Sequence, residues 1–180
     1  MKKILLFAFV ALVAMTGCEK KQSEFTIDSL GGNATLTGSV FYAPGYKIDS
    51  KGSDEQLEAL PAANQKLLVV VPNSSYLSGA SGNKTYETTI AKDGSFSITI
   101  PVPATKNLSG YDFDIRPFKA EYNAIVYNYE VYPYTKFEEK KTAYIDYISG
   151  LSTPSLKNGN TYYVGKVTLT YSKLIDINKK

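Results

Sequence analysis

The sequence predicts an all-β fold, a Greek-key β-sandwich of about seven to eight strands. Several segments alternate apolar and polar residues with a period of two, and short runs rich in β-branched and aromatic residues lie between turn signals. No segment gives a convincing long helix. The 180 residues suit one domain with a sizeable core. Strands distant in the sequence are expected to be connected in such a fold.

The predicted strands extend from residue 33 to residue 174. They are the segments 33–43, 67–71, 85–91, 96–102, 111–116, 122–134, 142–148 and 160–174. In the first segment, alternation places four residues on one buried face, namely Ala34, Leu36, Val40 and Tyr42. The second segment is a continuous apolar run that ends at Pro72.

Two long loops interrupt this first half of the chain. Residues 44–65 contain Pro, Gly and many charges, which predicts an excursion with one short helical turn near 54–60. Residues 73–83 are rich in Asn, Ser and Gly. Because binding tends to reside on long loops over a rigid sheet, both loops are candidate ligand surfaces, with disorder as the alternative.

Segments 85–91 and 96–102 are expected to form a hairpin. The residues between them, 92–95, read Lys-Asp-Gly-Ser, and Asp-Gly supplies the positive φ that tight hairpin turns need. Pro101 and Pro103 end the second strand or place it at a sheet edge, because proline has no N–H to donate.

Three further segments complete the predicted sandwich. Segment 122–134 is an aromatic strand with an expected bend or bulge near Pro133, and 142–148 is its partner across a charged turn at 138–141. In segment 160–174 the residues of one parity are expected to face inward, namely Tyr163, Val167, Leu169 and Tyr171. Gly165 interrupts this face and predicts a bulge.

The composition excludes several chemistries. The chain has no His and one Cys, so it cannot form a Ser-His-Asp triad, a Cys-His dyad, an internal disulfide or a thiolate-rich zinc site. Carboxylate-based hydrolysis and a hard metal held by oxygens remain open, but no motif supports them. We therefore expect a protein that is not an enzyme and needs no cofactor.

The N-terminus reads as an export signal. Two lysines precede a short apolar run, and Met15-Thr16-Gly17-Cys18 resembles the lipobox of bacterial lipoproteins. The resemblance implies a signal peptide at 1–17, lipidation of Cys18, and membrane attachment through acyl chains on that residue. In similar lipoproteins of Gram-negative bacteria, Asp directly after the Cys favours retention in the inner membrane. The residue here is Glu19, so the resemblance implies the outer membrane. The alternative is a cleaved, soluble secreted protein, and the side of the membrane stays open.

The rest of the chain then divides into a lipidated tether at 18–32 and one β-sandwich domain at 33–180. Loss of residues 1–17 would remove two lysines and leave 18 basic against 17 acidic residues, a net charge of +1. This charge gives no reason to expect a nucleic acid partner.

The middle of the chain resembles the carboxypeptidase regulatory-like domains, which share the transthyretin (prealbumin) fold. The residues that carry the resemblance are Leu36-Thr37-Gly38-Ser39-Val40, the apolar run 67–71, and Asp93-Gly94-Ser95-Phe96 with the strands around it. It covers 36–117, roughly half of the mature chain, and implies a sandwich and an accessory, binding or spacer role.

Tyrosine is the main candidate binding chemistry. Seven of the 15 tyrosines lie between residues 122 and 147. Tyr127, Tyr129, Tyr132 and Tyr134 are candidate binding residues, because an exposed aromatic row could stack on sugar rings or pack on a protein partner. The alternative is that these residues are core and cross-strand pairs of a β-sheet.

Two aspartates are a second candidate. Asp112 and Asp114 lie two residues apart on a predicted strand and point the same way, so with Glu121 or Asp93 they could hold a cation. Arg116 shares their parity, which favours a solvated charge ladder instead.

We therefore expect a membrane-anchored binding or accessory module at the cell envelope, facing the periplasm or the cell exterior. A structural assembly subunit, such as a pilus component that polymerises by strand exchange, is the alternative. A carboxylate hydrolase is the third hypothesis.

Overall fold

The structure is a computed structural model that describes residues 30–130 and 132–175. The predicted signal peptide, Cys18 and most of the tether lie outside these residues. The elements, in chain order, are β1 (Gly31–Tyr42), β2 (Tyr46–Ile48), β3 (Asp54–Gln56), β4 (Leu60–Pro61), β5 (Lys66–Pro72), α1 (Asn73–Tyr76), β6 (Asn83–Thr89), β7 (Ser95–Pro103), β8 (Asp112–Ile115), β9 (Phe118–Asn128), β10 (Thr135–Ile145), β11 (Thr161–Leu169) and β12 (Lys173–Ile175).

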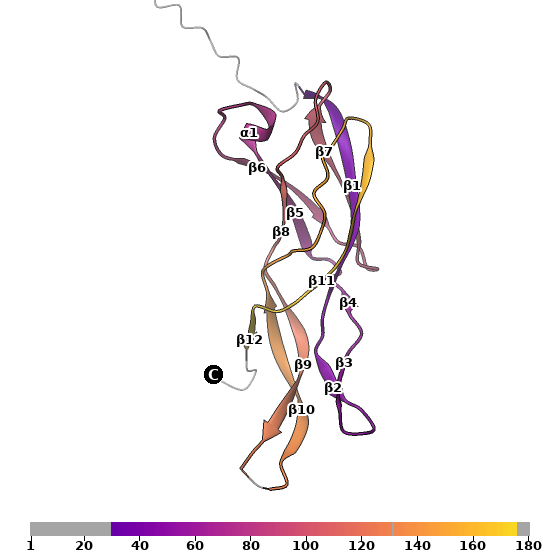
Figure 1. Cartoon of the computed structure of the whole chain (residues 1–180), viewed down its shortest axis with the longest axis vertical. Helices are drawn as coiled ribbons and strands as arrows, with labels where there is room; N and C mark the ends of the chain where they lie inside the picture. Colours follow the sequence, from indigo (N-terminus) through magenta and orange to yellow (C-terminus); the bar gives the residue numbers. More distant parts are fainter. Residues whose placement is uncertain (1–29, 131, 176–180) are drawn as a thin grey trace, which may run out of the picture.

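The upper part of the molecule is a sandwich of two sheets (Figure 1). In one sheet, β1 lies between β7, which is antiparallel to it, and β11, which is parallel to it. In the other sheet, β5 lies between β6 and β8. The all-β sandwich predicted from the sequence is confirmed, and β7 lies at a sheet edge as its prolines predict.

One apolar core fills the space between the two sheets. Alternation in β1 buries Ala34, Leu36 and Val40, as predicted, and the same period in β5 buries Leu67, Val69 and Val71. Burial of each such side chain stabilises the fold by about 1.5–3 kcal/mol relative to its exposure.

The lower part of the molecule is a long arm (Figure 1). Strands β9 and β10 pair along their whole lengths, from Phe118 opposite Ile145 to Asn128 opposite Thr135, and β12 adds to β10. The β2–β3 hairpin packs beside β9. The arm has a small core of its own, formed by Tyr122, Ala124 and Ala143 with Leu174 against them.

The excursion at 44–65 is more ordered than predicted. The prediction of a helical turn near 54–60 is wrong, because residues 54–56 form β3 and pair with β2. The Asp49 carboxylate accepts hydrogen bonds from the N–H groups of Lys51 and Ser53, which closes the turn of this hairpin. Three short strands, β2, β3 and β4, lie within this excursion, and segment 160–174 divides into β11 and β12. The number of described strands therefore rises from the predicted eight to twelve.

The hairpin predicted from 85–91 and 96–102 is also wrong. The turn itself is present, since Ala91 N–H donates to the Ser95 carbonyl and the Asp93 carboxylate accepts from Ser95 N–H. Beyond the turn, β6 pairs with β5 and β7 pairs with β1, in opposite sheets. This path buries the apolar face of β7 against the opposite sheet.

The turn of the β9–β10 hairpin lies elsewhere than predicted. We expected a charged turn at 138–141, but these residues lie inside β10, and the connection between the strands lies between Asn128 and Thr135. The charges are tolerated within the strand because they have partners there, such as Lys140 with Glu121 and Lys141 with Glu139. A hairpin is present, but the predicted pairing of 142–148 with 122–134 is wrong, because residues 142–145 pair with 118–121 and residues 122–128 pair with 135–141.

The predicted bulge in the last long strand is confirmed, and it explains a wrong expectation. The register between β1 and β11 shifts at Gly165, whose φ is +112°. Side chains therefore change face there. Val164 and Leu169 are buried, whereas Tyr163 is 69% exposed, contrary to its predicted inward position. Tyr171, also predicted to face inward, follows the end of β11 and is 40% exposed, with its ring against Tyr122.

Candidate binding surface at the tip of the arm

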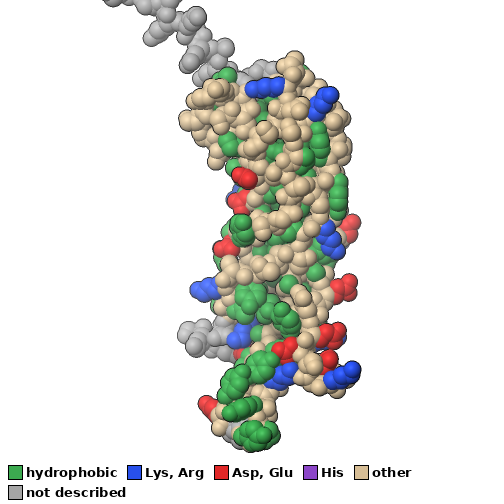
Figure 2. Space-filling view, viewed as in Figure 1, with side chains coloured by type: hydrophobic (Ala, Val, Ile, Leu, Met, Phe, Trp, Pro, Cys, Tyr) green, Lys and Arg blue, Asp and Glu red, His purple; other side chains and the backbone are tan. Residues whose placement is uncertain are grey.

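Five exposed aromatic side chains gather at the free end of the β9–β10 hairpin. They form what we call the aromatic tip, namely Tyr127, Tyr129, Tyr132, Tyr134 and Phe137. Their exposed fractions are between 44% and 84%, with Tyr132 the most exposed. Figure 2 shows these hydrophobic side chains at the end of the arm. The four tyrosines named from the sequence are thus brought together and lie outside both cores.

The tyrosine rings of the tip contact one another in a row. The rings of Tyr127 and Tyr129 are nearly parallel, with centroids 5.9 Å apart and planes at 15°. Tyr134 then meets Tyr129 edge-to-face at 5.4 Å, and Tyr132 meets Tyr134 edge-to-face at 5.7 Å. Such stacked and edge-to-face contacts restrict the orientation of the exposed rings.

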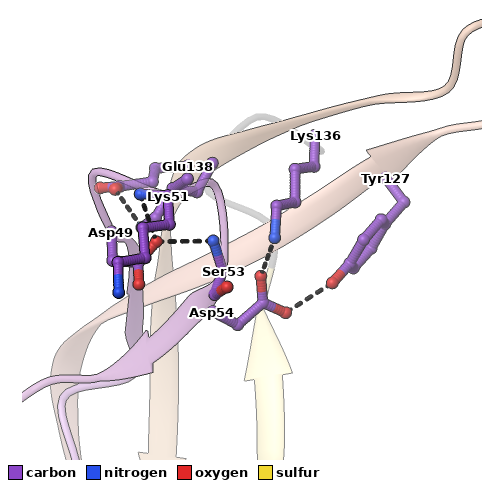
Figure 3. A network of polar contacts seen from close by, with 8 residues as sticks. Asp49, Lys51, Ser53, Asp54, Tyr127, Lys136 and Glu138 are labelled. Atoms are coloured by element: carbon purple, nitrogen blue, oxygen red, sulfur yellow. Dashed lines mark hydrogen bonds and ion pairs between the residues drawn. The ribbon is translucent and has the colours of Figure 1, made fainter.

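A polar network holds the base of the tip against the β2–β3 hairpin (Figure 3). The Asp54 carboxylate accepts a hydrogen bond from the Tyr127 hydroxyl and another from the Lys136 ammonium, each at 2.5 Å. The bond from Lys136, followed by that from Tyr127, lowers the pKa of Asp54. The same contacts raise the pKa of Tyr127 and of Lys136, so all three groups keep their protonation states near neutral pH.

A second contact docks the hairpin higher on the arm. The side-chain amide of Asn123, which is 5% exposed, donates to the Tyr46 carbonyl at 2.7 Å and to Glu138 at 2.8 Å. Glu138 also accepts from Ile48 N–H at 2.8 Å, and this bond is the first cause of its lowered pKa, with the Asn123 bond second.

Gly45 brings the two backbones close at this point. A Cβ atom there would lie 2.1 Å from the Asn123 carbonyl oxygen, and its φ is +110°. The position therefore requires glycine.

A shallow groove of about 450 Å³ lies beside the tyrosines. It combines apolar and polar walls, formed by Val126, Tyr127, Asn128, Tyr129, Glu130 and Phe137. The Asn128 side-chain oxygen accepts from Glu130 N–H at 3.0 Å. The Glu130 carboxylate and the Asn128 amide nitrogen have no partner among the residues that the structure describes.

The other candidates form no comparable site. Asp112 and Asp114 are exposed on β8, and Asp114 accepts from the N–H of Ile115. Arg116 bonds Glu87 at 2.9 Å rather than continuing a ladder of the two aspartates. Within residues 30–130 and 132–175, no three Asp, Glu, Cys or His side chains are placed to hold a metal ion.

Sequence reasoning missed the residues that brace the tip. Asp54 and Asn123 come from segments 69 residues apart, and neither has a motif around it. The one signal was parity, since Asn123 and Tyr127 share a face of the same predicted strand.

Comparison with known proteins assigns no family. No family model matches the sequence, and no curated protein matches it. In the described part of the chain, no helix has the length and apolar character that a membrane crossing needs. The predicted lipidation site, Cys18, lies outside the described residues.

Proposed function

We propose that this chain is an outer-membrane-anchored lipoprotein that acts as a non-catalytic binding or accessory module at the cell envelope, and that the aromatic tip is its binding surface. The observation that carries the proposal is the aromatic tip itself. Folded proteins seldom leave large apolar side chains gathered on the surface unless the patch binds something. Here the patch is also held in place by Asp54 and Lys136.

The position of the tip suits an anchored protein. Strand β1 starts at the end of the molecule opposite the aromatic tip (Figure 1). A lipid on Cys18 would attach to the chain on that side, twelve residues before Leu30. The arm then presents its tyrosines away from the anchored end, where a partner in the periplasm or outside the cell could reach them.

The pairing of β1 supports a binding module over an assembly subunit. Polymerisation by strand exchange needs a donor strand and an acceptor groove. Strand β1 is paired with β7 on one side and with β11 on the other. The likeness to carboxypeptidase regulatory-like domains agrees with an accessory role and remains part of the proposal.

Photocrosslinking in the producing cell tests the proposed surface. Tyr132 is replaced by a benzophenone amino acid, and Tyr163 on β11, which is 69% exposed, receives the same replacement as a control. We expect a crosslinked product at position 132 and none at position 163. Equal yields at the two positions, or no product at position 132, would overturn the aromatic tip as the binding surface.

A further inference from the structure

We infer that the aromatic tip binds an uncharged glycan chain. This inference deepens the proposed function and rests on it, because it assigns a ligand class to the same surface. Four features of the tip support it, namely the ring geometry, the polar groups of the groove, the charge and the width of the hairpin.

The first feature is the pair of nearly parallel rings. A pyranose has an apolar face of C–H groups that packs on an aromatic ring, while its hydroxyl groups point sideways into solvent. Tyr127 and Tyr129 stack on one another, with planes at 15° and centroids 5.9 Å apart, which fixes the exposed Tyr129 ring as a platform for one sugar unit. Tyr129 is 66% exposed, so its ring is accessible to such a ligand.

The second feature is the set of polar groups beside these rings. The groove contains the Glu130 carboxylate, which accepts hydrogen bonds, and the Asn128 amide nitrogen, which donates them. Neither group is engaged by another described residue. A ligand site of this kind, with apolar walls and a few free polar groups, matches the hydroxyl groups at the edge of a sugar ring.

The third feature is the charge. From Tyr127 to Phe137 the sequence contains one acid, Glu130, and one base, Lys136. Lys136 is already paired with Asp54. Residues 127–137 therefore offer no free cation to a phosphate, a sulfate or a sugar acid, and the free carboxylate of Glu130 repels them. This argues against nucleic acids, acidic lipids and charged glycans and in favour of a neutral ligand.

The fourth feature is the width of the surface. The arm is a two-stranded ribbon at its end, and neighbouring strands lie about 5 Å apart. A standard protein interface needs about 800 Å² from each partner. A narrow row of rings gives a long, thin contact instead, which suits a polymer chain better than the broad face of a folded protein.

Affinity electrophoresis tests the ligand class with the folded chain. Native gels carry a soluble neutral polysaccharide, such as galactomannan, xyloglucan, amylopectin or yeast mannan, and parallel gels carry polygalacturonate or heparin. A glycan array with neutral and charged structures extends the panel. We expect retardation by at least one neutral polysaccharide and none by the acidic ones.

Matched variants locate the binding. Tyr129→Ala removes one of the parallel rings and should weaken binding about tenfold, whereas Tyr163→Ala, which removes an equally exposed ring on β11, should leave it unchanged. Glu130→Gln should weaken binding to the same neutral polysaccharide, because an amide replaces the carboxylate acceptor.

The outcomes separate this inference from the proposed function. The inference is overturned by the absence of neutral-glycan binding, by preference for the acidic polymers, by cosedimentation with phosphatidylcholine vesicles alone, or by equal effects of the Tyr129 and Tyr163 variants. If the benzophenone at position 132 captures only a protein, the glycan inference falls while the aromatic tip stands. If position 132 captures nothing, both fall.

Discussion

The Tyr127 hydroxyl donates a 2.5 Å hydrogen bond to the carboxylate of Asp54, a residue 73 positions away in the sequence. This bond joins the β9–β10 hairpin to the β2–β3 hairpin next to the exposed rings. Because Tyr127 also stacks on Tyr129, a contact at the base of the tip restricts the orientation of the rings. The excursion at 44–65 therefore braces the tip.

The brace should make the arm sensitive to acid. The folded-state pKa values of Asp54 and Glu138 lie below their ordinary values of 3.8 and 4.5. Their contribution to stability is then complete above pH 4.5 and is lost as the pH falls through the lowered values. We expect the urea midpoint of the wild type to fall more steeply below pH 4.5 than that of an Asp54→Asn, Glu138→Gln double variant.

An exposed carboxylate without a partner gives the control for this pH series. Asp112→Asn removes one exposed acidic group from β8, and no hydrogen bond or ion pair joins this carboxylate to another described residue. The urea midpoint of this variant should change with pH in the same way as that of the wild type. Parallel profiles for the wild type and the double variant would show that the brace contributes nothing to acid stability.

Gly45 should tolerate no side chain. In Gly45→Ala the new Cβ meets the Asn123 carbonyl in a backbone with φ of +110°, so we expect a loss of more than about 2 kcal/mol in unfolding free energy. Gly52→Ala is the matched control, because its φ is +77° but nothing lies within 4 Å of its Cβ. That variant should cost about 1 kcal/mol, from the backbone conformation alone. Equal losses of unfolding free energy for the two variants, measured by urea unfolding, would contradict the close approach of Gly45 to the Asn123 carbonyl.

The upper core should dominate global stability. Leu36 is fully buried on β1 between two neighbouring strands, so Leu36→Ala should lower the unfolding free energy by about 2–5 kcal/mol. Leu77 is 47% exposed, and Leu77→Ala should change the unfolding free energy by less than about 0.5 kcal/mol. Urea titrations of the two variants at pH 7 check this difference.

The sequence predicts strands wherever alternation is regular. In β1 the period of two identifies the buried residues, because the strand faces the upper core on one side. Residues 67–71 of β5 are all apolar, so the sequence does not show that Leu67, Val69 and Val71 are the buried ones. The bulge at Gly165 was also predictable from the glycine in an alternating strand. Its effect on Tyr163 was not, since a glycine does not show where the register changes.

Strand pairing and the polar brace depend on contacts that local patterns do not contain. Asp93-Gly94 predicts a turn correctly, but the partner of β7 is decided by burial against the opposite sheet. Residues 138–141 look like a turn because they are charged, yet Glu121 and Asn123 on β9 provide partners for two of these side chains within the arm.

Loss of Cys18 should detach the protein from the membrane. If Cys18 is lipidated, Cys18→Ala removes the acyl chains that stable membrane attachment requires. We expect the wild type to incorporate an alkyne-labelled fatty acid and to sediment with outer membranes, and the variant to do neither. The Tyr163→Ala protein serves as the control for expression and export. A Cys18→Ala protein that still incorporates the label and sediments with membranes would disprove the lipoprotein assignment.

Two positions of the arm should differ in how they link glycan binding to stability. Asn123→Ala removes the amide that bonds Tyr46 and Glu138, so we expect a loss of about 1–3 kcal/mol in unfolding free energy. Binding should weaken too, because the brace beside Tyr127 loosens. Tyr129 is 66% exposed, so Tyr129→Ala should reduce binding while the urea midpoint hardly changes. Calorimetry with the bound glycan, beside urea unfolding, measures both effects.

If Asn123→Ala were destabilised but bound normally, the aromatic tip would not depend on its brace. If Tyr129→Ala lost stability and binding in proportion, the ring would be a structural element of the arm and not a ligand contact.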